Sequence, residues 1–317
     1  MAPRCGGKRR EQAPCNAGLE TCLVLGIFIL TTALVRANPV PASPSPVPKA
    51  AISQGGCEQG GLASISNRPG IGRAITIDGS PCVVPAGKVV FESGYRDQVT
   101  TGPGASWLVT YPNPVVRFGL ANGDEIVASP PLAFSFRTGA NLGGTFVPAS
   151  GIQDAGFGVK HVLHDLPWMQ DALEIFVTLP TGFPPGPHGF TYSIPTYLLG
   201  YSASFDLNDR LGVTTTQNFD IAAGTTADGA AQAYFSYQPS LGFSYALSTH
   251  TALLLQDQLT VPTAPGGLTG NRGFAAIQQS VGTNIVLDVE FEQNFLPLPG
   301  FNQHAVGAGL TLQPPLR

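Results

Sequence analysis

Residues of the types that catalyse reactions are few in this sequence, and their spacing suits no familiar reaction centre. Ser202, in the stretch GYSAS, and Ser244, in GFSYA, only half resemble a nucleophile elbow. His161 and His164 are three residues apart, which in an extended strand puts them on opposite faces and argues against a shared metal ion. We therefore predict no enzyme, no cofactor and no metal site. The enzyme alternative, a barrel phospholipase, would need a Ser–His pair that faces lipid on neighbouring strands.

Charged side chains that alternate with apolar ones are stronger candidates for a function. Alternating residues share one face of a strand, and where such a face lines a channel, rings of acidic groups favour the passage of cations. The alternative role is structural, because charges inside a small barrel must pair with one another across strands. Both roles stay open for the eight candidate residues, which are Glu92, Arg96, Arg117, Lys160, Glu174, Asp288, Glu290 and Glu292.

The elements that position these charges are predicted to be β-strands. From residue 285 to 291, Ile285, Leu287, Val289 and Phe291 lie on one face of the stretch, and acidic residues lie on the other. The same period of two runs through 171–179, 197–205, 211–219, 235–247 and 306–312. Stretches of this length match a tilted membrane strand of about 9–11 residues better than a soluble strand of about 5–6 residues.

Composition favours a membrane barrel over the other all-β architectures. Only 11% of residues are charged, and 39 glycines and 29 prolines exclude coiled coils, helical bundles and basic nucleic-acid binders. The polar faces carry Ser, Thr, Gly, Ala and Gln, where soluble strands usually expose Lys and Glu. Aromatic residues cluster near the strand ends, as in the girdles of membrane barrels. A secreted, soluble β-sandwich is the less favoured alternative, because it produces the same alternation.

Loop lengths complete the predicted architecture. Short connections at 121–124, 207–210, 248–250 and 281–284 alternate with longer ones, and 164–170 is longer than the others on the short side. This layout predicts an antiparallel, up-and-down transmembrane β-barrel of about twelve strands over residues 87–317, with the long loops outside the cell. Asp257 and His161 fall on the apolar face, and Pro130 and Pro131 interrupt the third stretch.

The N-terminal part carries the features of an exported protein. A basic segment, an apolar run from Thr21 to Val35 and small residues before position 38 predict a signal peptide over 1–37, cleaved between Ala37 and Asn38. A membrane anchor is the alternative, although the run is short for one. A Pro-rich linker follows over 38–56, and then a segment over 57–86. We expect Cys57 and Cys82 in that segment to form a disulfide, and two free buried thiols are the alternative.

Several motifs resemble one known family in their order and spacing. They begin with Arg68-Pro-Gly and with the stretch VPAGKVVFESGY from Val84, followed by VVRFGLANGDE from Val115. The stretches DAGFGVK from Asp154, LPTG from Leu179 and IVLD from Ile285 continue the series, so that the likeness spans about residues 68–312. The chain thus resembles the MetA-pathway of phenol degradation family. The resemblance implies an outer-membrane barrel, and members of this family are often described as transporters. The family name reflects an association with the degradation of aromatic compounds.

These observations lead to one functional hypothesis with two alternatives. The first is an outer-membrane channel or transporter for small solutes, including aromatic or hydrophobic ones. The alternatives are a non-conducting structural or adhesive barrel and the secreted sandwich. The expected partners are outer-membrane lipid, the barrel-assembly machinery and a small-molecule solute that the sequence does not name. No nucleic-acid partner is expected, and strand count does not decide conduction, because twelve strands lie between filled eight-stranded barrels and open sixteen-stranded porins.

Overall fold

The computed structural model describes the chain from Pro81 to Pro314 with internal gaps. The described residues are 81–102, 105–132, 134–139, 149–166, 168–183, 191, 194–208, 210–225, 231–262, 270–282, 284–295 and 302–314. The expected signal peptide with its cleavage site at Ala37 and Asn38, the linker over 38–56 and most of the segment over 57–86 lie outside them. Cys82 is disulfide-bonded, but its expected partner Cys57 also lies outside, so their pairing stays a prediction.

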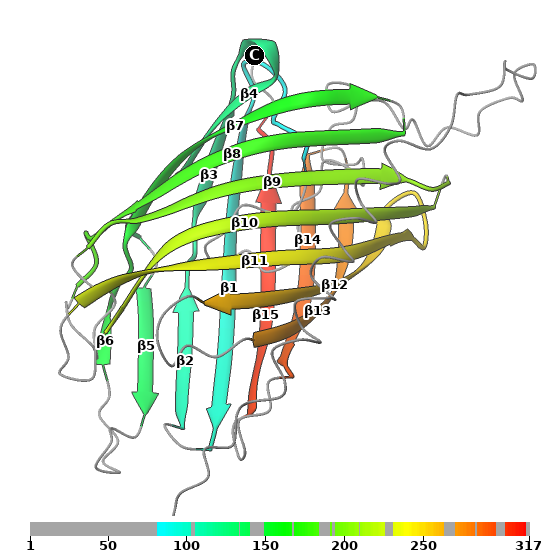
Figure 1. Cartoon of the computed structure of the whole chain (residues 1–317). Helices are drawn as coiled ribbons and strands as arrows, with labels where there is room; N and C mark the ends of the chain where they lie inside the picture. The colour runs from blue at the N-terminus through cyan, green and yellow to red at the C-terminus, as the bar shows by residue number, and fades with distance from the viewer. Residues whose placement is uncertain are drawn as a thin grey trace, which may run out of the picture. The chain divides into compact units, whose positions relative to one another are not determined.

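Antiparallel strands make up nearly all of the described structure, and all of them belong to one sheet. The segments are β1 (Val89–Thr101), β2 (Ser106–Tyr111), β3 (Val115–Gly119), β4 (Asp124–Ser129), β5 (Phe134–Gly139), β6 (Ala149–Ile152), β7 (Ala155–Leu166), β8 (Met169–Leu179), β9 (Thr196–Asp206), β10 (Leu211–Thr225), β11 (Ala231–Ala246), β12 (Thr251–Pro262), β13 (Gly270–Val281), β14 (Ile285–Asn294) and β15 (Asn302–Leu312). Figure 1 shows their arrangement.

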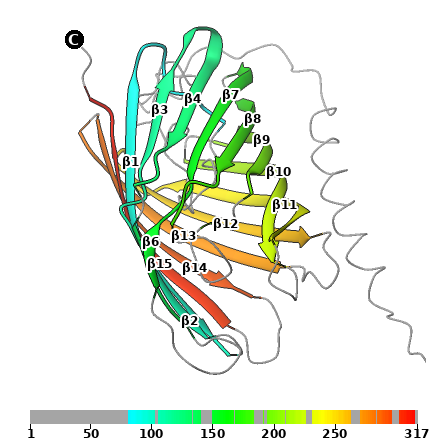
Figure 2. The same cartoon turned by 90° about the vertical axis from the view of Figure 1, so that its left-hand side faces the viewer.

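The sheet closes on itself, because its first strand pairs with its last. β1 pairs with β15 in continuous register from Phe91 opposite Leu312 to Thr101 opposite Asn302. Figure 2 shows the strands curving around an interior. β2 with β3, β4 with β5, and β6 with β7 are each one strand with an interruption, so the fifteen segments form twelve strands. The predicted twelve-stranded antiparallel barrel is confirmed.

The three interrupted strands are neighbours in the wall, and proline explains two of the breaks. Pro112 and Pro114 separate β2 from β3, and Pro130 and Pro131 separate β4 from β5. Proline has no backbone N–H to donate to a strand ladder, so the pairing stops at these positions. On one side of the breaks β3, β4 and β7 pair in order, and on the other side β2, β5 and β6 do so. The two groups diverge in Figure 1.

Short turns lie at one end of the barrel, which we call the turn end; the other is the loop end. At the turn end β3 joins β4 through a 3₁₀ turn, η2 (Ala121–Gly123), in which Asn122 and Gly123 have φ values of 64° and 76°. Both residue types tolerate this left-handed conformation. Connection 164–170 was predicted to be longer, which is wrong, since β7 continues to Leu166 and β8 begins at Met169. Among the described residues, no helix has the length and apolarity needed to cross a membrane.

Alternation along the strands separates an outer face from an inner one. On β8, Ile175 is 61% exposed whereas Glu174 is 5% exposed. On β14, Val289 is 59% exposed whereas Asp288 is 7% exposed. Large apolar side chains therefore cover the outside, and polar or charged side chains turn toward the interior. This is the arrangement of a barrel whose outer face contacts lipid.

Candidate functional site

The eight charged residues singled out from the sequence all lie on the inner face of the barrel. Six of them are buried and two, Arg96 and Glu290, are half-buried. The structure brings four of them into two groups at different heights, Glu92 with Arg117 and Arg96 with Glu292, and the other four lie outside these groups. The buried six are Glu92, Arg117, Lys160, Glu174, Asp288 and Glu292.

The first group lies near the turn end, and we call Arg117, Glu125 and Glu92 the turn-end cluster. Arg117 Nε donates to Glu125 Oε1 at 2.6 Å, and its Nη2 donates to Glu125 Oε2 at 3.0 Å. Arg117 Nη1 also donates to Glu92 Oε1 at 3.3 Å. Two parallel bonds between a guanidinium and a carboxylate are the strongest geometry for such a pair. Because Arg117 and Glu125 are 4% and 0% exposed, the pair is shielded from water.

The chain just before β1 closes over this cluster from the inside. The backbone N–H of Val84 donates to Glu125 Oε2 at 2.5 Å, and Arg117 Nη2 donates to the carbonyl oxygen of Cys82 at 3.2 Å. A Cβ atom on Gly119 would collide with the Val84 and Pro85 carbonyls, so the segment crosses β3 at close range. Residues 81–84 are all buried. This chain's own backbone thus lies against the inner wall at the turn end.

An apolar group lies on the inner wall between the two ends. Val127 of β4, Phe176 of β8 and Leu198 of β9 form a buried cluster, with Val115 of β3 packed against it. The Phe176 ring lies over Gly156 and Gly158 of β7, where an added Cβ atom would clash with the ring. These residues lie beside the strand interruptions. The inner face therefore includes an apolar area on β3, β4, β8 and β9.

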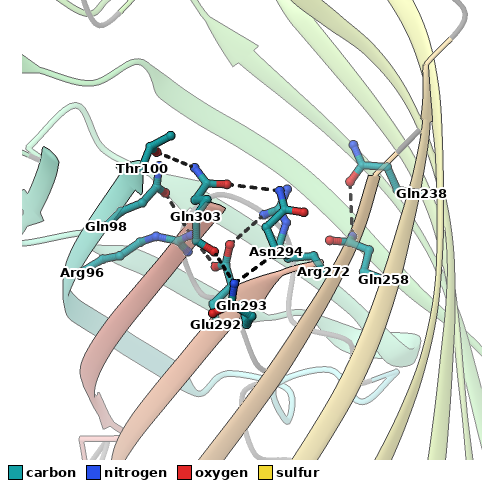
Figure 3. Close-up of polar contacts among 10 residues, drawn as sticks. All are labelled: Arg96, Gln98, Thr100, Gln238, Gln258, Arg272, Glu292, Gln293, Asn294 and Gln303. Carbon is teal, nitrogen blue, oxygen red and sulfur yellow. Dashed lines mark hydrogen bonds and ion pairs between the residues drawn. The ribbon is translucent and has the colours of Figure 1, made fainter. Parts of the chain in front are cut away.

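The second charged group lies toward the loop end, and we call Arg96, Arg272 and Glu292 the loop-end cluster. Arg96 Nη2 forms an ion pair and hydrogen bond with Glu292 Oε2, and it also donates to Gln98 Oε1 at 3.2 Å. Arg272 Nη1 lies 3.6 Å from Glu292 Oε1, and its guanidinium carbon lies 5.8 Å from the centre of the Phe274 ring. Figure 3 shows Arg96 and Arg272 on either side of Glu292.

Amide side chains surround the loop-end cluster and bond mainly to one another. Gln303 Nε2 donates to Thr100 Oγ1, and Asn294 Nδ2 donates to Gln303 Oε1, both at 3.4 Å. Figure 3 shows a second amide pair on β11 and β12, where Gln258 Nε2 donates to Gln238 Oε1 at 3.2 Å. Neutral groups of this kind present both donors and acceptors. The loop-end half of the interior is hence a polar surface with few charges.

Sequence reasoning missed two members of these clusters. Glu125 lies directly after the predicted turn 121–124, and its alternation with Val127 could have placed it on the inner face. Arg272 lies at the start of β13, and the small residues of that strand give it a weak apolar pattern. Alternation assigns a face, but it does not pair residues on distant strands. The ion pairs themselves could therefore not be predicted from the sequence.

The outer face carries the residues that did not fit the apolar pattern. His161 Nδ1 lies 2.7 Å from Asp124 Oδ1, and His164 Nδ1 lies 2.8 Å from Asp171 Oδ1. The prediction that the two histidines lie on opposite strand faces is wrong, because a register shift between Val162 and His164 turns both outward. Asp257 lies on the outer face of β12 and is exposed.

The described residues also bear on the catalytic and metal hypotheses. Ser202 and Ser244 alternate with outward-facing aromatic residues and so point inward. No histidine ring in the described part of the chain hydrogen-bonds to a serine side chain. Across the described residues, no group of three or more His, Cys, Asp or Glu side chains is placed to hold a metal ion.

Comparison with known proteins identifies the fold. No protein-family model matches the sequence, and neither does any curated protein. An outer membrane channel from Pseudomonas putida F1 is similar in structure, with 12% identity and a TM-score of 0.57 over 75% of this chain and 99% of that one. The translocator domain of the autotransporter NalP from Neisseria meningitidis gives 10% identity and a TM-score of 0.51 over 71% and 88% of the two chains.

These similarities support the family resemblance as far as the architecture, which is an outer-membrane β-barrel. They do not extend to the phenol-degradation name. One of the two similar structures is a channel and the other is a translocator domain. The same fold therefore serves different tasks, and the function has to be argued from the interior of the barrel.

Proposed function

We propose that this protein is an outer-membrane channel that passes small solutes, aromatic or hydrophobic ones among them. The observation that carries the proposal is the inner wall of the loop-end half, which is polar, partly exposed and lined by amides around the loop-end cluster. A barrel that served only as a membrane anchor would have no need of such a surface. The likeness to the phenol-degradation family supports solutes with an apolar part.

The proposal includes the partners expected from the sequence. Exposed apolar side chains on the outer face suit outer-membrane lipid, and an outer-membrane barrel is expected to need the barrel-assembly machinery. We assign no catalytic role, since the inward Ser202 and Ser244 lie on the opposite face from the outward histidines. The eight inner charges are assigned in part to structure and in part to the solute path. Glu92 and Arg117 belong to the structural part, whereas Arg96 and Glu292 belong to the path.

One observation favours the alternative of a non-conducting structural or adhesive barrel. The backbone of residues 82–84 lies against Arg117 and Glu125 inside the turn end of the barrel. A segment in this position narrows the interior, and solute would have to pass beside it. The conduction experiment decides between the two candidates.

The experiment records single-channel currents from the purified full chain in planar lipid bilayers. A matched pair of variants places the same bulk on the two faces. Gly94→Trp on β1 adds a ring to the inner face, where an added Cβ atom comes no closer than 3.4 Å to a neighbour. Ala308→Trp on β15 adds a ring to the outer face, next to Tyr95 in register with it. We expect discrete current steps that Gly94→Trp reduces and Ala308→Trp leaves unchanged. Folded protein without current steps would favour the non-conducting barrel.

A further inference from the structure

The loop-end cluster is unbalanced in charge and in hydrogen bonding. Two guanidinium groups, on Arg96 and Arg272, share the single carboxylate of Glu292. Arg96 takes the direct hydrogen bond, and it also bonds to Gln98. Arg272 is left at 3.6 Å, a separation too long for a hydrogen bond. The cluster therefore carries one uncompensated positive charge.

Arg272 is the member with unused donors. A guanidinium has five N–H donors, and among the described residues that of Arg272 makes no hydrogen bond. Its side chain is 36% exposed, whereas those of Arg96 and Glu292 are 14% and 4% exposed. The Phe274 ring beneath it supports the planar group through a cation–π contact. Arg272 is thus held at the inner wall with its donors open to the interior.

Among the described residues around Arg272, the polar side chains bond mainly to one another. Gln303, Asn294 and Thr100 use their groups on one another, as Figure 3 shows. Asp220, on the inner face of β10, accepts hydrogen bonds from Ser236 and Gln238. Gln258, which lies opposite Arg272 in register, donates to Gln238. Among the described residues the remaining donors of Arg272 are thus open to an acceptor that a solute supplies.

We propose that Arg272, together with Arg96, binds the carboxylate group of an anionic solute in the loop-end half of the barrel. The guanidinium fork matches a carboxylate in two parallel hydrogen bonds, which a spherical anion does not reproduce. The cluster already holds one carboxylate, that of Glu292, against the same pair of arginines. The solute class is hence a small organic acid. The inference rests on the proposed function, because a solute reaches Arg272 through the barrel interior.

At the loop-end cluster the local charge is opposite to the acidic excess of the eight inner residues. Eight inner charges with an acidic excess suggested a preference for cations. In the structure, Glu92 and Glu292 are paired with arginines, and the uncompensated charge of the loop-end cluster is positive. Glu292 then acts as an internal competitor that lowers the affinity of the cluster for a solute carboxylate.

The test measures binding of benzoate and benzamide to the purified full chain in detergent micelles by ligand-observed nuclear magnetic resonance. The two probes have nearly the same shape and differ in charge. We expect benzoate to bind and benzamide to bind at least about tenfold more weakly, which is the loss that one charge-assisted hydrogen-bonded pair produces. Arg272→Gln should weaken benzoate binding by a similar factor. The control Arg210→Gln, in the turn between β9 and β10, should leave it unchanged.

A second variant separates solute binding from a purely structural role. Glu292→Gln removes the internal competitor, so we expect it to strengthen benzoate binding, in the opposite direction to Arg272→Gln. A heat-modifiability gel confirms that each variant is folded. Equal binding of benzoate and benzamide, or benzoate binding that Arg272→Gln leaves unaltered, would overturn the inference. Because binding is measured without current, a barrel that binds benzoate but passes no current would contradict the proposed function and leave the inference standing.

Discussion

Two clusters in one barrel interior are built from the same two residue types, arginine and glutamate, and have opposite character. In the turn-end cluster, Arg117 is 4% exposed and is bonded on several sides by Glu125, by Glu92 and by the backbone before β1. In the loop-end cluster, Arg272 is 36% exposed at the side chain and has one long contact to a carboxylate. The protein itself accepts hydrogen bonds from the guanidinium of Arg117. The guanidinium of Arg272 makes no hydrogen bond to the described residues.

The difference teaches that residue type does not separate a structural charge from a binding charge. A buried ion pair contributes to stability only through good geometry and complete hydrogen bonding, since desolvation of the two charges is expensive. A binding group needs the reverse, namely a supported position and unused donors. Burial and the count of partners are therefore the observations that assign a role to each inner charge.

The largest effect expected from this comparison concerns the buried carboxylate. Glu125→Gln leaves Arg117 buried without its bidentate partner, so we expect the free energy of unfolding to fall by about 3–5 kcal/mol. Glu292→Gln should cost less, because Arg96 keeps its hydrogen bond to Gln98 and is partly exposed, and Arg272 is open to the interior. Urea unfolding followed by heat-modifiability gels measures both variants. Equal losses at the two sites would remove the distinction between the clusters.

A smaller effect tests which face of β14, the strand that carries Glu292, meets lipid. Leu287 of β14 is exposed, and its neighbour Asp288 is buried on the other face. Leu287→Arg should destabilise the folded barrel by about 2–4 kcal/mol if position 287 meets the middle of the bilayer. Asp288→Asn should lower stability by less. The measurement is reversible unfolding in lipid vesicles. If Leu287→Arg leaves the barrel stable and Asp288→Asn prevents folding, the inner and outer faces of β14 are assigned the wrong way round.

The smallest of the three effects tests how tightly the interior is packed away from the loop end. Gly158→Ala places a methyl group against the Phe176 ring, and overpacking of this kind costs about 1–3 kcal/mol. Gly94→Ala, on β1 below Arg96, meets only a backbone oxygen at 3.4 Å and should be close to neutral. Urea midpoints compare the two variants. A neutral Gly158→Ala would mean that the apolar area is loose enough to admit the methyl group.

Much of the fold could be predicted from the sequence because its main signal is local. Alternation over 285–291 assigns Leu287 and Asp288 to opposite faces, and the Asn122-Gly123 pair lies in a turn where both residues have positive φ. Two interruptions were missed, at Pro112–Pro114 and between β6 and β7. The bulge beside His164 was also missed, because one extra residue shifts the alternation without a residue type that signals it.

The candidate site was predicted less completely, because it depends on which strands are neighbours. Glu292 and Arg96 were both expected on inner faces, but their contact joins β14 to β1 across the closing seam. Arg272 was missed entirely, and its importance comes from its exposure and its single long contact. Neither property is visible in a linear pattern. Sequence could therefore name most of the charged residues but could not say which of them are satisfied.

The seam between β1 and β15 has a kinetic consequence for the loop-end cluster. Arg96 and Glu292 are separated by 196 residues, and their contact depends on pairing of the first strand with the last. Contacts of such high sequence separation form late, because the entropy of ordering the intervening chain must be overcome first. Until then β1 presents an unpaired edge, which is the part of a sheet most prone to wrong partners. The solute site is thus completed by the same event that removes the aggregation hazard, so a chain able to bind its solute has already finished closing.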